Sequence, residues 1–136
     1  MNFLLDENLP PNWSSVLVEA SRRQFPDAML GEVGHIRDRF GVSAQDTVWL
    51  DALGAEKNWA VLSGDAFRKR QGAERRLIRK HGITVFVLQP SWSSRRYWDK
   101  LSQLVLWWPK IVAQANAVEA STFEVPWRSS GRFRQI

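Results

Sequence analysis

The chain has 136 residues, a length that suits one domain with its own hydrophobic core. It contains no cysteine, which excludes disulfides and thiolate metal sites. Asp6 and Glu7 interrupt the first apolar run, and no apolar stretch is long enough to span a bilayer. We therefore expect a cytoplasmic protein with no membrane partner. The formal net charge of +5 favours a polyanionic partner, of which nucleic acid is the commonest.

The chain begins with a short apolar run that ends in charge. Residues 3–5 are contiguous apolar residues, which is typical of a strand buried on both faces of a parallel sheet. The Pro-Pro pair that follows favours the first turn of a helix over residues 11–24. Because ligands gather beyond the carboxyl ends of such strands, Asp6 stands at a candidate site.

The next segment contains weaker signals and then a second helix. Residues 28–30 and 34–36 can each form a short strand, the latter at a sheet edge. Residues 43–57 are predicted to be a helix, and Ser43 with Asp46 resembles a capping box at its start. Helical spacing assigns the buried face of this helix to Val48, Trp49, Ala52 and Leu53.

The strand-then-helix pattern then repeats. Residues 59–62 form a second contiguous apolar run, which ends shortly before Asp65. A strongly basic helix is expected over residues 68–81, with Gly82 as its stop. Residues 83–88 are rich in β-branched side chains and form the clearest strand of the chain. This alternation argues for an α/β fold with a mostly parallel sheet.

The last third is predicted to contain a long helix, a strand and a tail. The helix begins near Ser94, and Pro109 should kink it or start a new helix. Residues 122–125 form a strand, expected at a sheet edge because a proline follows at once. We take residues 1–126 as a single domain and residues 127–136 as a loose basic tail.

Aromatic residues are abundant near the C-terminus. The apolar stripe of the long helix is predicted at Tyr97, Trp98, Leu101, Leu104, Val105 and Trp108. Trp107, Trp108 and Trp127 form either an exposed patch for a partner or a filled core under this helix. We favour the core for at least two of the three.

Three acids stand at candidate rim positions: Asp6, Asp46 and Asp65. Three carboxylates brought together repel one another, and a hard divalent cation such as Mg²⁺ or Mn²⁺ relieves that repulsion. Each acid has a structural alternative. Asp46 can complement a helix dipole and Asp65 can cap the next helix, whereas Asp6 has the weakest such alternative because burial of a carboxylate is costly.

Four further residues are candidates for a supporting or substitute ligand: Glu7, Asn8, Ser63 and Glu74. Glu7 can equally be solvated, and Glu74 can pair with Arg70 on the basic helix. Ser63 has no nearby base in the sequence, which argues against nucleophilic catalysis.

The basic residues most suited to RNA are Arg68, Lys69, Arg70 and Arg37. Arg39 can extend the same surface, and the structural alternative is a solvated helix face. His35 and His81 lack metal-ligand spacing, so we expect structural roles for both.

Three motifs resemble a known family. The opening Phe-Leu-Leu-Asp-Glu-Asn-Leu-Pro, residues 3–10, resembles the start of PIN-like domains, the ribonuclease fold of VapC-type toxins. Asp46 in Ser-Ala-Gln-Asp-Thr-Val-Trp-Leu resembles the acid of that family's central helix. Val-Leu-Ser-Gly-Asp, residues 61–65, resembles its acid-ending strand. The resemblance covers roughly residues 1–90, and the stretch beyond it resembles a VapC-related subgroup.

The resemblance implies a three-layer α/β/α sandwich, dependence on Mg²⁺ or Mn²⁺, RNA cleavage and a small antitoxin partner. We therefore expect a metal-dependent endoribonuclease, with Asp6, Asp46 and Asp65 as catalytic metal ligands and a homodimer as an open alternative. The chain departs from the family where Ala66 and Phe67 directly follow Asp65, because many relatives carry a further acid there. A non-catalytic RNA- or partner-binding module, or a structural protein, are the competing hypotheses.

Overall fold

The computed structural model of the chain describes residues 1–64 and 72–136. Asp65, Arg68, Lys69 and Arg70, all singled out by the sequence, lie outside the described residues. Six strands form one sheet in the order β2-β1-β3-β4-β5-β6. The strands are β1 (Asn2–Leu5), β2 (Val33–His35), β3 (Trp59–Ser63), β4 (Thr84–Leu88), β5 (Thr122–Val125) and β6 (Arg134–Gln135).

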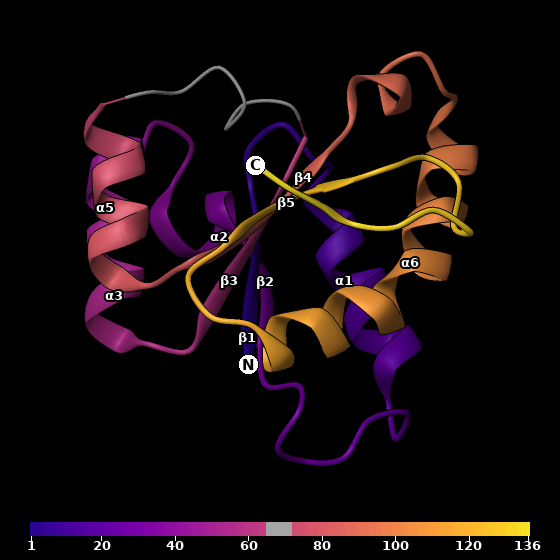
Figure 1. Cartoon of the computed structure of the whole chain (residues 1–136), viewed down its shortest axis with the longest axis horizontal. Helices are drawn as coiled ribbons and strands as arrows, with labels where there is room; N and C mark the ends of the chain where they lie inside the picture. Colours follow the sequence, from indigo (N-terminus) through magenta and orange to yellow (C-terminus); the bar gives the residue numbers. More distant parts are fainter. Residues whose placement is uncertain (65–71) are drawn as a thin grey trace.

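Helices cover both faces of this sheet. They are α1 (Asn12–Ser21), α2 (Ile36–Phe40), α3 (Asp46–Glu56), α5 (Ala73–His81) and α6 (Tyr97–Ala117), with a 3₁₀ turn η1 (Pro90–Trp92). Figure 1 shows α3 and α5 on one side of the sheet and α1 and α6 on the other. The pairs among β1 to β5 are all parallel, so the three-layer α/β/α sandwich with a mostly parallel sheet is confirmed. Within the described ranges, no helix combines the length and apolar character needed to cross a bilayer.

The central strands contribute to two separate cores because successive side chains point to opposite faces. Phe3 and Leu5 of β1 are buried against the layer of α1 and α6. Leu4, between them, is buried in the second core with Trp49 and Leu53 of α3. The contiguous apolar run at the start of the chain is therefore explained by burial on both faces.

A close helix contact fixes the layer that carries Asp46. Gly54 of α3 lies against His81 of α5, and a Cβ at Gly54 would come within 2.0 Å of the imidazole ring. The His81 Nε2 lies 2.9 Å from a carboxylate oxygen of Asp51, also on α3. His81 thus has the structural role expected of it. Helix α5 stops before Gly82, as predicted, and this glycine has a left-handed φ of 63°.

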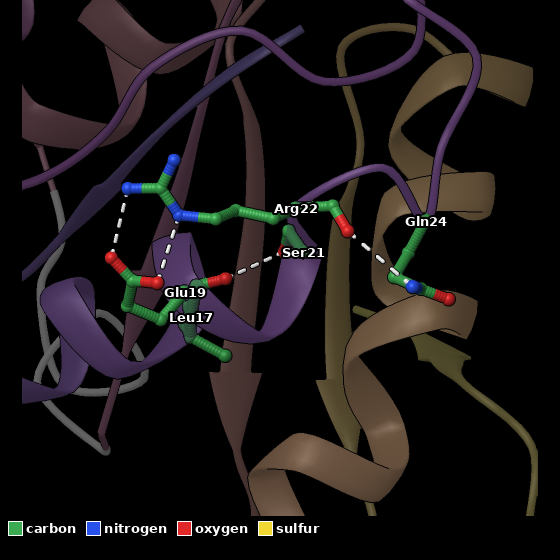
Figure 2. A network of polar contacts seen from close by, with 5 residues as sticks. All are labelled: Leu17, Glu19, Ser21, Arg22 and Gln24. Carbon is green, nitrogen blue, oxygen red and sulfur yellow. Dashed lines mark hydrogen bonds and ion pairs between the residues drawn. The ribbon is translucent and has the colours of Figure 1, made fainter.

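The end of α1 is held by local bonds, which Figure 2 shows, and by one long-range bond to α6. The Arg22 guanidinium donates two hydrogen bonds to Glu19, of 2.8 and 2.9 Å, and these lower the pKa of the exposed Glu19 carboxyl. The Ser21 hydroxyl donates to the Leu17 carbonyl at 2.6 Å and accepts from the Trp108 indole at 2.8 Å. This last bond joins α1 to α6 across the layer.

Two predicted helical faces are partly wrong. Val48 is 58% exposed, and Leu50 is buried in its place. The capping box is also wrong, because α3 begins at Asp46 after Gln45 and has no side-chain cap bond. Trp98 of α6 is 75% exposed rather than part of its apolar stripe.

The long helix is continuous, with Pro109 inside it. Figure 1 shows α6 changing direction along its length, as expected of a helix that contains a proline. Trp107 and Trp108 are buried, and the half-buried Trp127 packs edge-on against Trp92 at 4.8 Å. The core interpretation of these tryptophans is confirmed.

The C-terminal segment packs onto the sheet rather than remaining loose. Its strand β6 pairs antiparallel with β5, so β5 is not the edge strand that the following proline indicated. The ring of Phe133 lies 5.0 Å from Trp107 and 5.5 Å from Phe86. Phe133 and Trp127 thus both tie the returning chain to the core. The position of the domain boundary stays a prediction.

We predict that Phe133→Ala lowers the free energy of unfolding by about 2 kcal/mol, less than the roughly 3–5 kcal/mol typical of a fully buried phenylalanine. Urea denaturation provides the measurement. Arg132→Ala is the control, because Arg132 is exposed and its replacement should change stability by no more than about 0.5 kcal/mol. Equal stability of the two variants would show that the C-terminal segment adds nothing to the core.

Candidate functional site

Asp6 is buried at the carboxyl end of β1, with only 1% of its surface exposed. The register aligns Leu5 with Leu62, so the ends of β1 and β3 meet at this point. The Ser63 hydroxyl donates to Asp6 Oδ2 at 3.0 Å, and the Glu7 backbone N–H donates to Oδ1 at 2.7 Å. A buried carboxylate needs such donors to offset its lost hydration. Burial and bonding therefore set one acid at the sheet edge where ligands gather.

The loop after Asp6 is fixed by two further contacts. Asn8 Oδ1 accepts a 2.9 Å hydrogen bond from the backbone N–H of Gly64, which joins this loop to the end of β3. A Cβ at Gly64 would come within 2.8 Å of the Asn8 amide, so a larger residue at position 64 would displace Asn8 from this bond. On the other side, the buried His35 contacts the Leu9 carbonyl through Nε2 at 2.7 Å.

The His35 contacts also define its tautomer. Its Nδ1 accepts from the Arg37 backbone N–H at 3.1 Å, so Nε2 carries the proton and donates to Leu9. His35 is thus a structural link between β2 and the loop, as the sequence indicated.

An oxygen-rich hollow of about 440 Å³ includes Glu7, the residue after Asp6, and lies between the loop after β1 and the first turns of α3 and α5. Three carboxylates line it, and they come from Glu7, Asp46 and Glu74. The Trp49 indole N–H donates to Asp46 Oδ1 at 3.0 Å and so orients this carboxylate from within its own helix. Ser43, Gln45 and Thr47 add polar groups to the same rim.

These acids do not form a finished metal centre by themselves. Among residues 1–64 and 72–136, no three side chains of the metal-binding types are close enough to hold an ion. Asp6 belongs to the sheet edge, whereas Asp46 faces the hollow that Glu7 shares. The donors are nevertheless all oxygen, which is the ligand chemistry of Mg²⁺ and Mn²⁺.

Of the basic residues proposed for RNA contacts, Arg37 is among those that the structure describes. Arg37 is exposed on α2, which follows the edge strand β2. Arg39, in contrast, pairs with Glu32 and Glu56 and lies over the Trp59 ring at 4.7 Å. Since Trp59 begins β3, Arg39 lies at the amino end of the strands, away from Asp6. Arg68, Lys69 and Arg70 lie outside the described residues.

Sequence reasoning missed a second hollow at the same edge. It measures about 290 Å³ and joins the loop after Asp6 to the end of β4 and the start of α6. Its lining includes Gln89, Tyr97 and Lys100, which come from a turn and a helix far along the chain. Only the apolar stripe that begins at Tyr97 could have drawn attention to it, and that pattern indicated core.

Comparisons with known proteins agree with this architecture. The family described as PIN like domain matches residues 1–90, a stretch that runs from β1 past the end of β4. No curated protein and no solved structure matches the chain. The family match includes Asp6, the carboxyl end of β3, and the three acids that line the hollow. The chain belongs to the family of PIN-like domains.

Proposed function

We propose that the chain is a metal-dependent endoribonuclease that hydrolyses RNA phosphodiesters. The observation that carries the proposal is the buried Asp6 carboxylate at the carboxyl edge of a PIN-like sheet, beside a hollow lined by further acids. A buried carboxylate has a high desolvation cost, and a residue with only a structural role would not need to carry that charge.

Asp6, Asp46 and Asp65 are the proposed ligands of Mg²⁺ or Mn²⁺, and all three supply the hard oxygen donors that these ions prefer. Asp65 enters as a proposal from the sequence. Glu7 and Glu74, which line the hollow with Asp46, are the candidates to replace the family's missing further acid. When bound, the ion supplies Lewis-acid polarisation of a phosphodiester and a water of lowered pKa.

The remaining residues prepare these groups. Ser63 and the Glu7 backbone N–H hold the two Asp6 oxygens in fixed directions, and the Trp49 indole does the same for Asp46. Asn8 fixes the loop after Asp6 to the end of β3 by accepting a hydrogen bond from the Gly64 backbone N–H. Such preorganisation avoids a cost of reorientation during the reaction.

RNA would be held by charge. Arg37, Arg68, Lys69 and Arg70 are the proposed contacts to the phosphate backbone, with affinity that falls as salt rises. The family resemblance further suggests the toxin of a toxin–antitoxin pair, with a small antitoxin as protein partner. A homodimer and a cytoplasmic location belong to the same proposal.

The second candidate is a non-catalytic RNA- or partner-binding module on the same fold. It is favoured by one observation, that the described acids do not form a group of three able to hold a metal. RNA binding with no cleavage in either Mg²⁺ or Mn²⁺ would select this alternative.

The first prediction concerns activity. Purified protein should cleave single-stranded RNA in Mn²⁺ or Mg²⁺ and stop when EDTA is added. Asp6→Asn and Asp65→Asn should each lower the cleavage rate by about 100-fold or more, because loss of one group that stabilises developing charge typically costs 10²–10³. Gel analysis of labelled RNA fragments measures the rate.

Asp27→Asn is the matched control, because Asp27 is an exposed acid in a turn near the end of α1. It should retain full activity, and circular dichroism should show that every variant is folded. Cleavage that persists at the parental rate in Asp6→Asn contradicts the assignment.

The second prediction concerns metal binding without RNA. At a Mn²⁺ concentration about 100 times its Kd, the folded state should gain about 2.7 kcal/mol, which raises the melting temperature by several degrees. Asp6→Asn should lose this increase, and Glu74→Gln should reduce it if Glu74 replaces the missing acid. Differential scanning fluorimetry with and without Mn²⁺ measures the increase within each variant.

Glu119→Gln serves as the control because Glu119 is exposed and lies outside the hollow. An identical Mn²⁺ response in Asp6→Asn and in the parent chain would place the ion elsewhere.

A further inference from the structure

The second hollow at the sheet edge has the features of a ligand site. Its volume of about 290 Å³ lies at the lower end of the roughly 300–1,000 Å³ typical of small-molecule pockets. A single planar group fits this size better than a folded peptide does. Residues from five segments line it: the loop after β1, the start of α1, the end of β3, the end of β4 with η1, and the start of α6.

This hollow adjoins the proposed catalytic edge. Asn8 lines it and lies two residues after Asp6 in the chain. Gly64 lines it as well and directly follows Ser63, the hydrogen-bond donor to Asp6. A group bound here would therefore be attached to a chain that passes next to the Asp6 carboxylate.

Tyr97 provides a flat wall that is already held in place. Its ring is 39% exposed, and its hydroxyl accepts a 2.9 Å hydrogen bond from the Asn12 amide. The rings of Trp13 and Trp98 lie 5.8 and 5.2 Å from it, between their centroids. An exposed aromatic ring fixed on several sides is a suitable surface for stacking of a base.

One polar side chain at the pocket is free to bond a ligand. The buried indole N–H of Trp13, a lining residue, has no hydrogen-bond partner among the described residues, but protein atoms enclose it, so Trp13 meets the pocket through its ring. Gln89 adds an amide with both donors and an acceptor, and its side chain makes no hydrogen bond within residues 1–64 and 72–136.

Lys100 adds a positive charge to the same lining. No ion pair involves its ammonium group among the residues that the structure describes. An aromatic wall, an amide and one cation together match a nucleobase with its attached phosphate. A purely apolar ligand would leave the amide and the cation unused.

We propose that this pocket binds one nucleobase of the RNA strand, next to the phosphodiester that reaches Asp6. The proposal rests on the proposed function, since it assigns a base-binding subsite to that nuclease. Tyr97 stacks on the base, Gln89 bonds to its edge beside the Trp13 ring, and Lys100 contacts a neighbouring phosphate. The pocket then selects which position in the strand is cut.

The test measures binding separately from cleavage. In EDTA, each of the four ribonucleoside 5′-monophosphates is added at millimolar concentration to ¹⁵N-labelled full chain, and the indole N–H signals of its eight tryptophans are followed by NMR. At least one nucleotide should shift the Trp13 signal. The Trp49 signal, whose indole bonds to Asp46 in the other hollow, should stay unchanged.

Matched variants sharpen the result. Tyr97→Ala should weaken binding about 5- to 150-fold, the loss expected for one stacking contact. Tyr97→Phe keeps the ring and should bind like the parent chain. Lys100→Ala should weaken binding of the nucleotide but leave binding of the corresponding nucleoside unchanged, because only the nucleotide carries the phosphate.

Failure of this proposal is distinct from failure of the proposed function. If no nucleotide shifts Trp13, or if inorganic phosphate alone reproduces the shift, the base pocket is wrong even when the protein cleaves RNA. Conversely, a nucleotide-dependent Trp13 shift in a protein that never cleaves RNA supports the pocket and rejects the nuclease. Equal affinity of Tyr97→Ala and the parent chain also overturns the proposal.

Discussion

Burial of the Asp6 carboxylate is the constraint on which the rest of this structure depends. The charge lies at the end of a strand that is enclosed on both faces, where desolvation costs several kcal/mol unless donors replace water. The Ser63 hydroxyl and the Glu7 backbone N–H are two such donors. The Ser63 bond requires the ends of β1 and β3 to meet in register, whereas the Glu7 bond comes from the next residue in the chain. The sheet must therefore form correctly before the acid can be accommodated.

The two helical layers give this edge different chemistry on its two sides. The layer of α3 and α5 carries Asp46 and Glu74 to the oxygen-rich hollow. The layer of α1 and α6 carries Tyr97 to the smaller aromatic pocket. Asp6 stands between the two layers because it directly follows β1, whose side chains are buried in both cores. In the proposed function, the metal-binding groups and the base-binding groups therefore come from opposite helical layers.

Local patterns predicted the elements that are dominated by local physics. The apolar runs at residues 3–5 and 59–62 identified two buried strands, and therefore the position of Asp6. The exposure of Val48 was not predictable, because the orientation of α3 depends on its contact with α5. The return of Phe133 to the core likewise depends on a long-range pairing that no local pattern encodes. The pocket beside Tyr97 was missed because its lining comes from five separate segments.

The most direct test of the proposed metal site at Asp6 is a crystal of the full chain soaked in Mn²⁺, with anomalous data collected near the manganese edge. We expect an anomalous peak at the carboxyl edge of the sheet, at a metal–oxygen distance of roughly 2.0–2.3 Å from the Asp6 carboxylate. Ligands from Asp46 and Asp65 should complete the site. Well-ordered crystals with no peak at this edge, or with manganese bound only at other acids, would contradict it.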